Sequence, residues 1–265
     1  MQIAERHNGI GQRVGLSVCP NAALVTLALG ALLWIPVIGS AGALGFLAAG
    51  GLLMARNPAA TVSALSRYWF VLLLPLYCLA SSLWSDYPGI TFRFSLQLLA
   101  TVVIAVTAAT RLAPATFHRV LFLIFFSVIL ASLIAGNARD FDGAWLGIFG
   151  SKNALAAASA TFLVLALALA LDRNATARLR LAALAGLPAG LVLLIMAKST
   201  GAILIAMPVL LTIPILILSR RLSGGQKLAA AALTATTLIL MFTLFLAFRE
   251  AIFAALLDQT GKDVT

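Results

Sequence analysis

Long apolar segments separated by short polar turns dominate this chain. Hydrophobic residues make up 62% of 265 residues, charged residues make up 10%, and the mean hydropathy is +1.08. Soluble domains are closer to half apolar and a quarter charged, so water cannot be the solvent for this much apolar surface. We therefore expect an all-α, polytopic membrane helix bundle.

Nine segments approach the 17–25 apolar residues that a transmembrane helix needs. They are residues 21–37, 40–55, 68–84, 92–110, 117–136, 153–171, 181–197, 200–219 and 228–248. The first two are short and are separated only by a few small residues, which suggests a tight hairpin. Residues 1–20 lack the apolar core of a cleavable signal, so the first segment is expected to remain as an anchor.

The basic residues predict the orientation. With the N-terminus in the cytoplasm, 12 of the 18 basic residues face the cytoplasm and 6 the other side, the bias of the positive-inside rule. The cytoplasmic set is Arg6, Arg13, Arg56, Arg67, Arg111, Arg119, Arg173, Arg178, Arg180, Arg220, Arg221 and Lys227. The outer set is Arg93, Arg139, Lys152, Lys198, Arg249 and Lys262. This charge pattern explains the net charge of +10 without nucleic acid as a partner.

Three of the outer cations lie where a predicted span begins or ends. Arg93 begins the fourth span, and Gln97 and Thr101 follow on the same helical face, which we expect to point into the bundle. The alternative for Arg93 is a side chain that snorkels to the lipid headgroups.

Lys152 and Asn153 begin the sixth span, with Ser151 as the expected N-cap. A helix N-terminus offers free N–H groups and the positive end of the dipole, which suits a phosphate. Gly147 and Gly150 would let the backbone approach a ligand closely. The alternative is an ordinary helix start with one interfacial lysine.

Lys198 precedes Ser199 and Thr200 in a turn before the eighth span. Three helix ends would then present cations at the same membrane level. Together they predict a binding site for a polyanionic headgroup, formed by Arg93, Gln97, Lys152, Asn153, Lys198, Ser199 and Thr200.

Other chemistry-bearing residues give weaker signals. Cys19 and Cys78 are expected to be unpaired thiols, His7 and His118 to be surface residues, and Asp86 to be a turn residue before a proline. The sequence has no nucleotide-binding loop, metal cluster or paired catalytic carboxylates, so we expect neither a metal nor a cofactor.

Three motifs resemble those of the O-antigen ligase superfamily, which includes polysaccharide polymerases, and are most similar to its exopolysaccharide-production branch. They are SSLWSDYPGITFRFSLQLL at 81–99, GIFGSKNALA at 147–156 and MAKSTGAIL at 196–204. In addition, LLDQTGKDVT at 256–265 resembles a stretch that runs directly into a Thr-Gly-Arg motif in that branch. The resemblance covers nearly the whole chain.

The resemblance implies a membrane-embedded glycosyltransferase of the bacterial inner membrane, in exopolysaccharide or lipopolysaccharide biosynthesis. Such enzymes transfer a glycan from undecaprenyl pyrophosphate to an acceptor glycan or lipid A core on the periplasmic side. It also implies that the residues of the predicted headgroup site hold the donor.

The family has a large periplasmic loop with a second arginine and a histidine, followed by further spans. The chain is therefore expected to be one incomplete transmembrane domain, with 249–265 as the start of that loop. Its catalytic residues are expected beyond residue 265, so that the chain alone would be inactive.

Two other functions stay open at this stage. A transporter or flippase for an anionic lipid or polysaccharide intermediate would also place cations at membrane level. A non-catalytic remnant that folds without activity is the third possibility.

Overall fold

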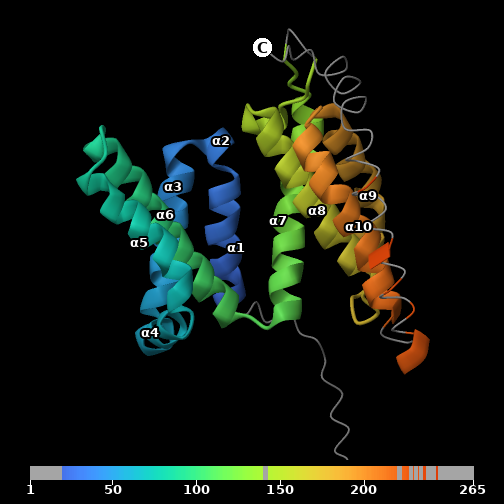
Figure 1. Ribbon diagram of the computed structural model, residues 1–265, viewed down its shortest axis with the longest axis horizontal. Coiled ribbons are helices and arrows are strands. Elements are labelled where there is room, and N and C mark those ends of the chain that lie inside the picture. The colour runs from blue at the N-terminus through green and yellow to red at the C-terminus, as the bar shows by residue number, and fades with distance from the viewer. Residues whose placement is uncertain are drawn as a thin grey trace, which may run out of the picture.

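The computed structural model describes residues 20–139 and 143–219, together with isolated residues between 223 and 243. In this part of the chain the architecture is entirely helical. The helices between Ser40 and Arg111 lie on one side and those between Pro114 and Ser219 on the other, and the first helix, Pro20–Leu33, packs against both sides (Figure 1). The predicted all-α bundle is confirmed.

The first predicted segment is a broken helix. A single residue, Trp34, separates α1 (Pro20–Leu33) from α2 (Ile35–Ile38), which has a proline in its first turn. Gly39, at φ +60°, then turns the chain into α3 (Ser40–Ala55). A Cβ on Gly42 would lie 2.8 Å from the carbonyl oxygen of Ala31, so only glycine permits this close α1–α3 packing. The expected tight hairpin is present.

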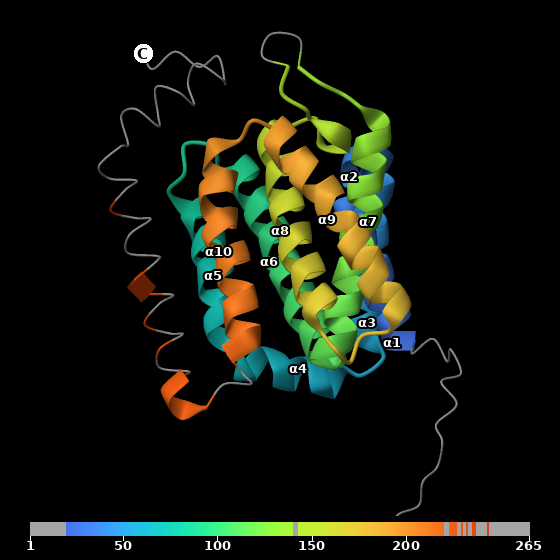
Figure 2. The same ribbon diagram turned by 90° about the vertical axis from the view of Figure 1, so that its right-hand side faces the viewer.

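The next helices after α3 begin at prolines. Proline has no backbone N–H group, and the N–H group at the first position of a helix has no partner within the helix, so proline is favoured there. α4 (Pro58–Arg67) is followed by η1 (Trp69–Leu72), α5 (Leu73–Ala80) and η2 (Ser81–Leu83). α6 (Pro88–Arg111) and α7 (Pro114–Ala135) follow, joined by only two residues. α4 lies across the lower end of the bundle, whereas α5, α6 and α7 run along it (Figure 2).

The second side contains the largest core. Its elements are η3 (Gly147–Phe149), α8 (Lys152–Leu171), α9 (Ala177–Met196) and α10 (Thr200–Ser219). The rings of Phe122 and Phe162 stack with their centroids 5.7 Å apart. Cβ atoms on Gly186 and Gly190 would lie within 2.8 Å of the Phe162 ring, so these two glycines admit the ring between α8 and α9.

The number of membrane-spanning helices differs from the prediction. Four helices in the described part are long and apolar enough to cross a bilayer: Pro88–Arg111, Pro114–Ala135, Lys152–Leu171 and Ala177–Met196. The bent pair Pro58–Arg67 and Trp69–Leu83 would make a fifth. Pro20–Leu33, Ser40–Ala55 and the first part of α10, Thr200–Pro214, are shorter apolar segments. The predicted segment 228–248 lies outside the described residues apart from isolated positions.

The count of nine spans is therefore not supported. The physical reason is that two predicted segments are broken: 21–37 stops at Leu33, and 68–84 is divided into η1, α5 and η2. The segment 40–55 is one helix as predicted, but it has only 16 residues. A hydropathy pattern does not show such breaks, because the broken and continuous helices have the same composition.

Large apolar side chains cover the outside of the bundle. Ile134 is 86% exposed and Leu44 is 68% exposed. Such a surface fits a lipid solvent rather than water.

The described basic residues lie at the two ends of the bundle in the same two groups that the topology prediction assigned to the two sides of the membrane. One end of the bundle, where α6 ends and α7 begins, carries seven: Arg56, Arg67, Arg111, Arg119, Arg173, Arg178 and Arg180. The opposite end, uppermost in Figure 1, carries Arg93, Arg139, Lys152 and Lys198. Which end faces the cytoplasm remains a prediction.

Candidate functional site

The segment that joins α7 to α8 folds into a short hairpin at the upper end of the bundle. Gly136, the residue that follows α7, is left-handed at φ +59° and ends the helix. The N–H group of Arg139 donates to the carbonyl of Ala144 over 2.9 Å, and that of Leu146 donates to the carbonyl of Asn137 over 2.8 Å. Residues 140–142 of this hairpin, which include Asp140 and Asp142, lie outside the described residues.

The hairpin is fixed to the end of α9. The N–H group of Trp145 donates to the carbonyl of Met196 over 2.9 Å, and the Trp145 side chain packs against the core of α7–α9. A Cβ on Gly143 would lie 3.8 Å from the Lys198 Nζ atom, so the Lys198 ammonium group lies beside this hairpin.

Gly147 holds the next turn against α7. Its φ is +53°, and an added Cβ would lie 2.7 Å from the Ser132 side chain and 3.0 Å from that of Leu155. The Ile148 N–H group donates to the Ser132 hydroxyl oxygen over 3.4 Å. Of the two glycines predicted to allow a close backbone approach, Gly147 approaches α7, whereas nothing lies within 4 Å of a Cβ on Gly150.

Lys152 is the first residue of α8 and is only 5% exposed. Lysine is rarely buried to this degree, which makes the position unusual. Ser151 is the N-cap residue as predicted, with extended backbone at φ −141° and ψ 126°, but its side chain makes no capping hydrogen bond. The cap function expected of the Ser151 hydroxyl is therefore wrong.

A cavity of about 280 Å³ lies at this helix start. Its lining residues are Arg139, Leu146, Gly150, Ser151, Lys152 and Asn153. Two cationic side chains, a hydroxyl, an amide and the N-terminus of a 20-residue helix thus border one space. Such a combination suits a small anionic group, because the dipole and the donors all favour negative charge.

The turn between α9 and α10 closes against the same helix start. The buried Ser199 hydroxyl donates to the Asn153 side-chain oxygen over 3.1 Å. Lys198 adopts a left-handed backbone at φ +47°, which reverses the chain before α10 begins at Thr200. Lys152, Asn153, Lys198, Ser199 and Thr200 are therefore brought together, as the sequence predicted.

Arg93 and Gln97 do not join this group. Both side chains are exposed on α6, whose main packing partners are α3, α4 and α5. The Thr101 hydroxyl donates to the Gln97 carbonyl within the same helix over 2.8 Å. The predicted inward polar stripe is wrong, because neighbouring helices cover other faces of α6, and the upper part of α6 lies away from α8 (Figure 1).

The arginine that lines the cavity is Arg139, whereas the sequence predicted Arg93 as the arginine of the site. The sequence placed Arg139 among the outer cations but offered no reason to select it, because it lies 13 positions before Lys152. The hairpin between them brings the two residues to the same cavity. The only signal in the sequence for a role of Arg139 was its position a few residues before Gly147 and Gly150.

Other predicted positions are also placed by the structure. His118 is half-buried rather than a surface residue, and its Nε2 atom lies 2.9 Å from the carbonyl oxygen of Leu165 on α8. Cys78 is a free thiol, and Asp86 is exposed in the turn before α6. His7 and Cys19 lie outside the described residues. Among the described residues, no group of three His, Cys, Asp or Glu side chains could hold a metal.

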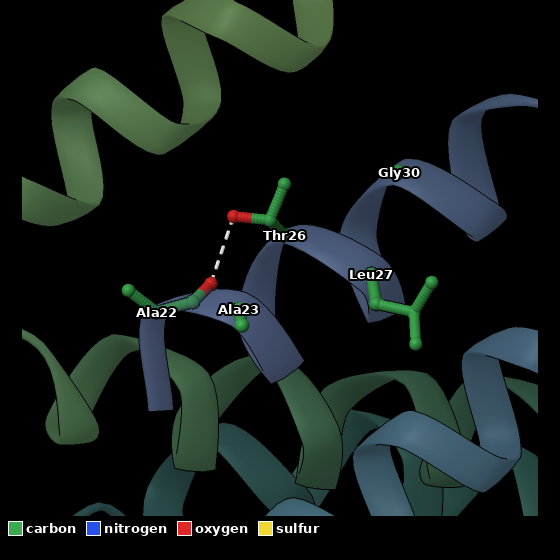
Figure 3. Close-up of a pocket in the computed structure, with 5 residues that line it drawn as sticks. All are labelled: Ala22, Ala23, Thr26, Leu27 and Gly30. Carbon is green, nitrogen blue, oxygen red and sulfur yellow. Dashed lines mark hydrogen bonds between the residues drawn. The ribbon is translucent and has the colours of Figure 1, made fainter. Parts of the chain in front are cut away.

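A shallow surface pocket of about 520 Å³ lies along α1 and has no charged lining. Its lining residues all belong to one helix: Ala22, Ala23, Thr26, Leu27 and Gly30 (Figure 3). The Thr26 hydroxyl donates to the Ala22 carbonyl over 2.8 Å, so its proton is already used. Thr26 is the one polar side chain in this lining, so the pocket carries no argument for a charged ligand.

Comparison with protein family models, curated proteins and solved structures finds no match to this chain.

Proposed function

We propose that this chain belongs to a membrane-embedded glycosyltransferase of the O-antigen ligase and polysaccharide polymerase type, and that it binds the lipid-linked donor glycan. The observation that carries the proposal is the buried Lys152 at the N-terminus of α8, beside a cavity that Arg139 and Asn153 also line. The motifs at 81–99, 147–156 and 196–204 add support through their resemblance to that family.

The donor chemistry suits this cavity. The pyrophosphate of undecaprenyl-pyrophosphate glycan is the leaving group in the proposed transfer, and it gains negative charge as the glycosidic bond breaks. Cations and N–H donors aimed at that charge stabilise it without a metal or cofactor. A cavity of about 280 Å³ fits a compact headgroup better than a glycan, which would extend beyond it.

Each residue would contribute to donor binding according to the chemistry of its side chain. Arg139 would hold phosphate oxygens with its planar fork, and Lys152 would supply a point charge at the helix start. Asn153 and Ser199 would fix α8 against the α9–α10 turn through their hydrogen bond, and Lys198 would extend the positive region toward the hairpin. Arg93 and Gln97 are left out of this arrangement because they lie on α6.

The proposed location is the bacterial inner membrane, with this site at the periplasmic side. The end of the bundle that holds the site carries four described cations, whereas the opposite end carries seven. The positive-inside rule places the more basic end in the cytoplasm. An acceptor glycan or lipid A core would then reach the donor from the periplasm.

A transporter or flippase for an anionic lipid is the second candidate. The 83° bend between Pro58–Arg67 and Trp69–Leu83 favours it, because broken helices are common in transporters. The two functions differ in a measurable way: a flippase moves labelled lipid across reconstituted vesicles, and a donor-binding protein does not.

The test is binding of undecaprenyl pyrophosphate to the full chain in lipid nanodiscs, with inorganic pyrophosphate as competitor. Lys152→Met removes the charge but keeps the length of the side chain, and Arg139→Gln removes the guanidinium group. Each is expected to weaken binding by about 10-fold, corresponding to about 1.4 kcal/mol, as for the loss of a charge-assisted hydrogen bond. Unchanged affinity in both variants would overturn the proposal.

Arg93→Gln distinguishes the structural site from the one inferred from sequence. If the site lies at the α8 start, Arg93→Gln changes the affinity less than twofold, a difference of about 0.4 kcal/mol. A loss equal to that of Lys152→Met would return Arg93 to the site and contradict the arrangement described above.

A further inference from the structure

Helix α4 lies across the more basic end of the bundle because the chain turns sharply before the helix and again after it. At its start, the Asn57 side chain accepts a hydrogen bond from the Ala60 N–H group over 3.1 Å, and Pro58 follows as the first helical residue. At its end, Tyr68 leaves helical geometry at φ −110° and ψ 30°. The following helix then runs at 83° to α4 (Figure 2).

Arg111 fastens α4 to the end of α6. Its guanidinium group donates to the Asn57 carbonyl and to the Thr61 hydroxyl, the latter over 2.9 Å. Thr61 and Ala64 are buried on this face. The opposite face of α4 is exposed at Ala59, Val62, Ser63 and Ser66.

This end of the bundle is strongly positive. Among the described residues it carries seven arginines and one acid, Asp172. Three of the arginines join helices: Arg111 as above, Arg119 to the carbonyl of Asn174, and Arg180 to the carbonyl of Ala170. The remaining four, Arg56, Arg67, Arg173 and Arg178, are exposed.

Aromatic residues lie beside these cations at the α4–α5 junction. The Arg67 guanidinium group lies over the Tyr68 ring at 5.7 Å, and Trp69 is 59% exposed. Tyr and Trp gather where hydrocarbon meets headgroups, because one end of each ring system is apolar and the other polar. The composition of the α4–α5 junction is therefore typical of a segment at a membrane interface.

We infer that α4 lies in the plane of the membrane surface and binds anionic lipid headgroups through two exposed arginines, Arg56 just before the helix and Arg67 at its last position. A helix that runs perpendicular to its neighbouring span, with one face packed on protein and cations at both ends, has the geometry of an interfacial helix. Anionic headgroups are the partner because exposed cations at a membrane surface attract them. The inference concerns the end opposite the donor site and does not depend on the proposed function.

Depth measurement tests the orientation of α4. In a background with Cys19→Ser and Cys78→Ala, single cysteines replace Ala59, Val62, Ser63 and Ser66 in turn and carry a spin label. The full chain is reconstituted in vesicles of phosphatidylcholine and phosphatidylglycerol, and oxygen and nickel-complex accessibility give the depth of each label. Positions along one face of an in-plane helix share one depth, so the four values should agree within about 3 Å at headgroup level.

Two outcomes of the depth scan would overturn the inference. A helix that crosses the membrane rises about 1.5 Å per residue, so residues 59 and 66 would differ in depth by about 10 Å. Four equal depths within the hydrocarbon core would also contradict a headgroup contact.

Lipid selectivity tests the anionic partner. Spin-labelled phosphatidylglycerol and phosphatidylcholine report their relative association with the protein, and we compare Arg67→Gln with the charge-preserving Arg67→Lys. Each basic residue near an anionic surface should contribute up to about fivefold, so Arg67→Gln should lower the preference for phosphatidylglycerol severalfold, and salt should lower it further. Arg67→Lys should retain the preference. An equal preference in all three proteins would overturn the lipid-binding role.

Discussion

Replacing Gly147 by alanine tests how the hairpin before α8 holds the start of that helix. Gly147 has φ +53°, a conformation that residues with a Cβ rarely adopt. The added Cβ would lie 2.7 Å from both the Cβ and the Oγ atom of Ser132, and 3.0 Å from Leu155. Ser132 is buried in α7 and its Cβ is attached to the helix backbone, so it cannot move aside without shifting the helix.

Two separable costs give the expected magnitude. The left-handed backbone costs about 1–2 kcal/mol for a residue with a Cβ. Forcing an extra methyl group into a filled contact costs about 1–3 kcal/mol more. Gly147→Ala should therefore lower the free energy of unfolding by about 2–5 kcal/mol.

Gly150→Ala is the matched control, three residues further along the same turn. Gly150 has φ +63°, and nothing lies within 4 Å of an added Cβ, so only the backbone cost applies. We expect a loss of about 1–2 kcal/mol. The difference between the two variants isolates the contact with Ser132 and Leu155.

Reversible unfolding of the purified chain in mixed detergent micelles, followed by circular dichroism, measures both variants against the original chain. The prediction is that Gly147→Ala is less stable than Gly150→Ala by about 1–3 kcal/mol, the cost of overpacking. Equal stabilities would refute the reasoning, because they would show that the turn does not pack on α7 as the structure describes.

Two further changes test packing and polar contacts by the same unfolding assay. Gly186→Ala should destabilise the chain by about 1–3 kcal/mol, because its Cβ would lie 2.7 Å from the Phe162 ring, whereas Gly30→Ala meets nothing within 4 Å and should stabilise α1 by up to about 1 kcal/mol. Comparable effects of the two glycine changes would contradict the α8–α9 packing. Asn153→Ala should cost about 1 kcal/mol by removing the acceptor of the Ser199 hydroxyl, and a double-mutant cycle with Ser199→Ala should show coupling of about 0.5–1.5 kcal/mol. Additive effects in that cycle would mean that the hydrogen bond does not stabilise the fold.

Local sequence patterns predicted the parts of this fold that depend on neighbouring residues. The apolar segment after Lys152 predicted α8 to start there and end at Leu171, which the structure confirms. The helices that begin at Pro88 and Pro114 start four and three residues before the predicted segments 92–110 and 117–136, so these boundaries were predicted less closely. Long-range contacts were predicted less well: the segments that contain Lys152 and Lys198 meet through the Asn153–Ser199 hydrogen bond, but Arg93 lies on α6, away from them.

Composition alone determined that this chain is helical and apolar enough for a membrane, because a helix satisfies its backbone hydrogen bonds within one segment and needs no distant partner. Periodicity could not determine which face of α6 is covered, because the side chains around Arg93 are apolar on several faces. Only the tertiary structure decided that α4 lies across the bundle and that Arg139 reaches the cavity beside Lys152. Both depend on where chain reversals place helices relative to one another, and residues far apart in the sequence settle those positions by packing.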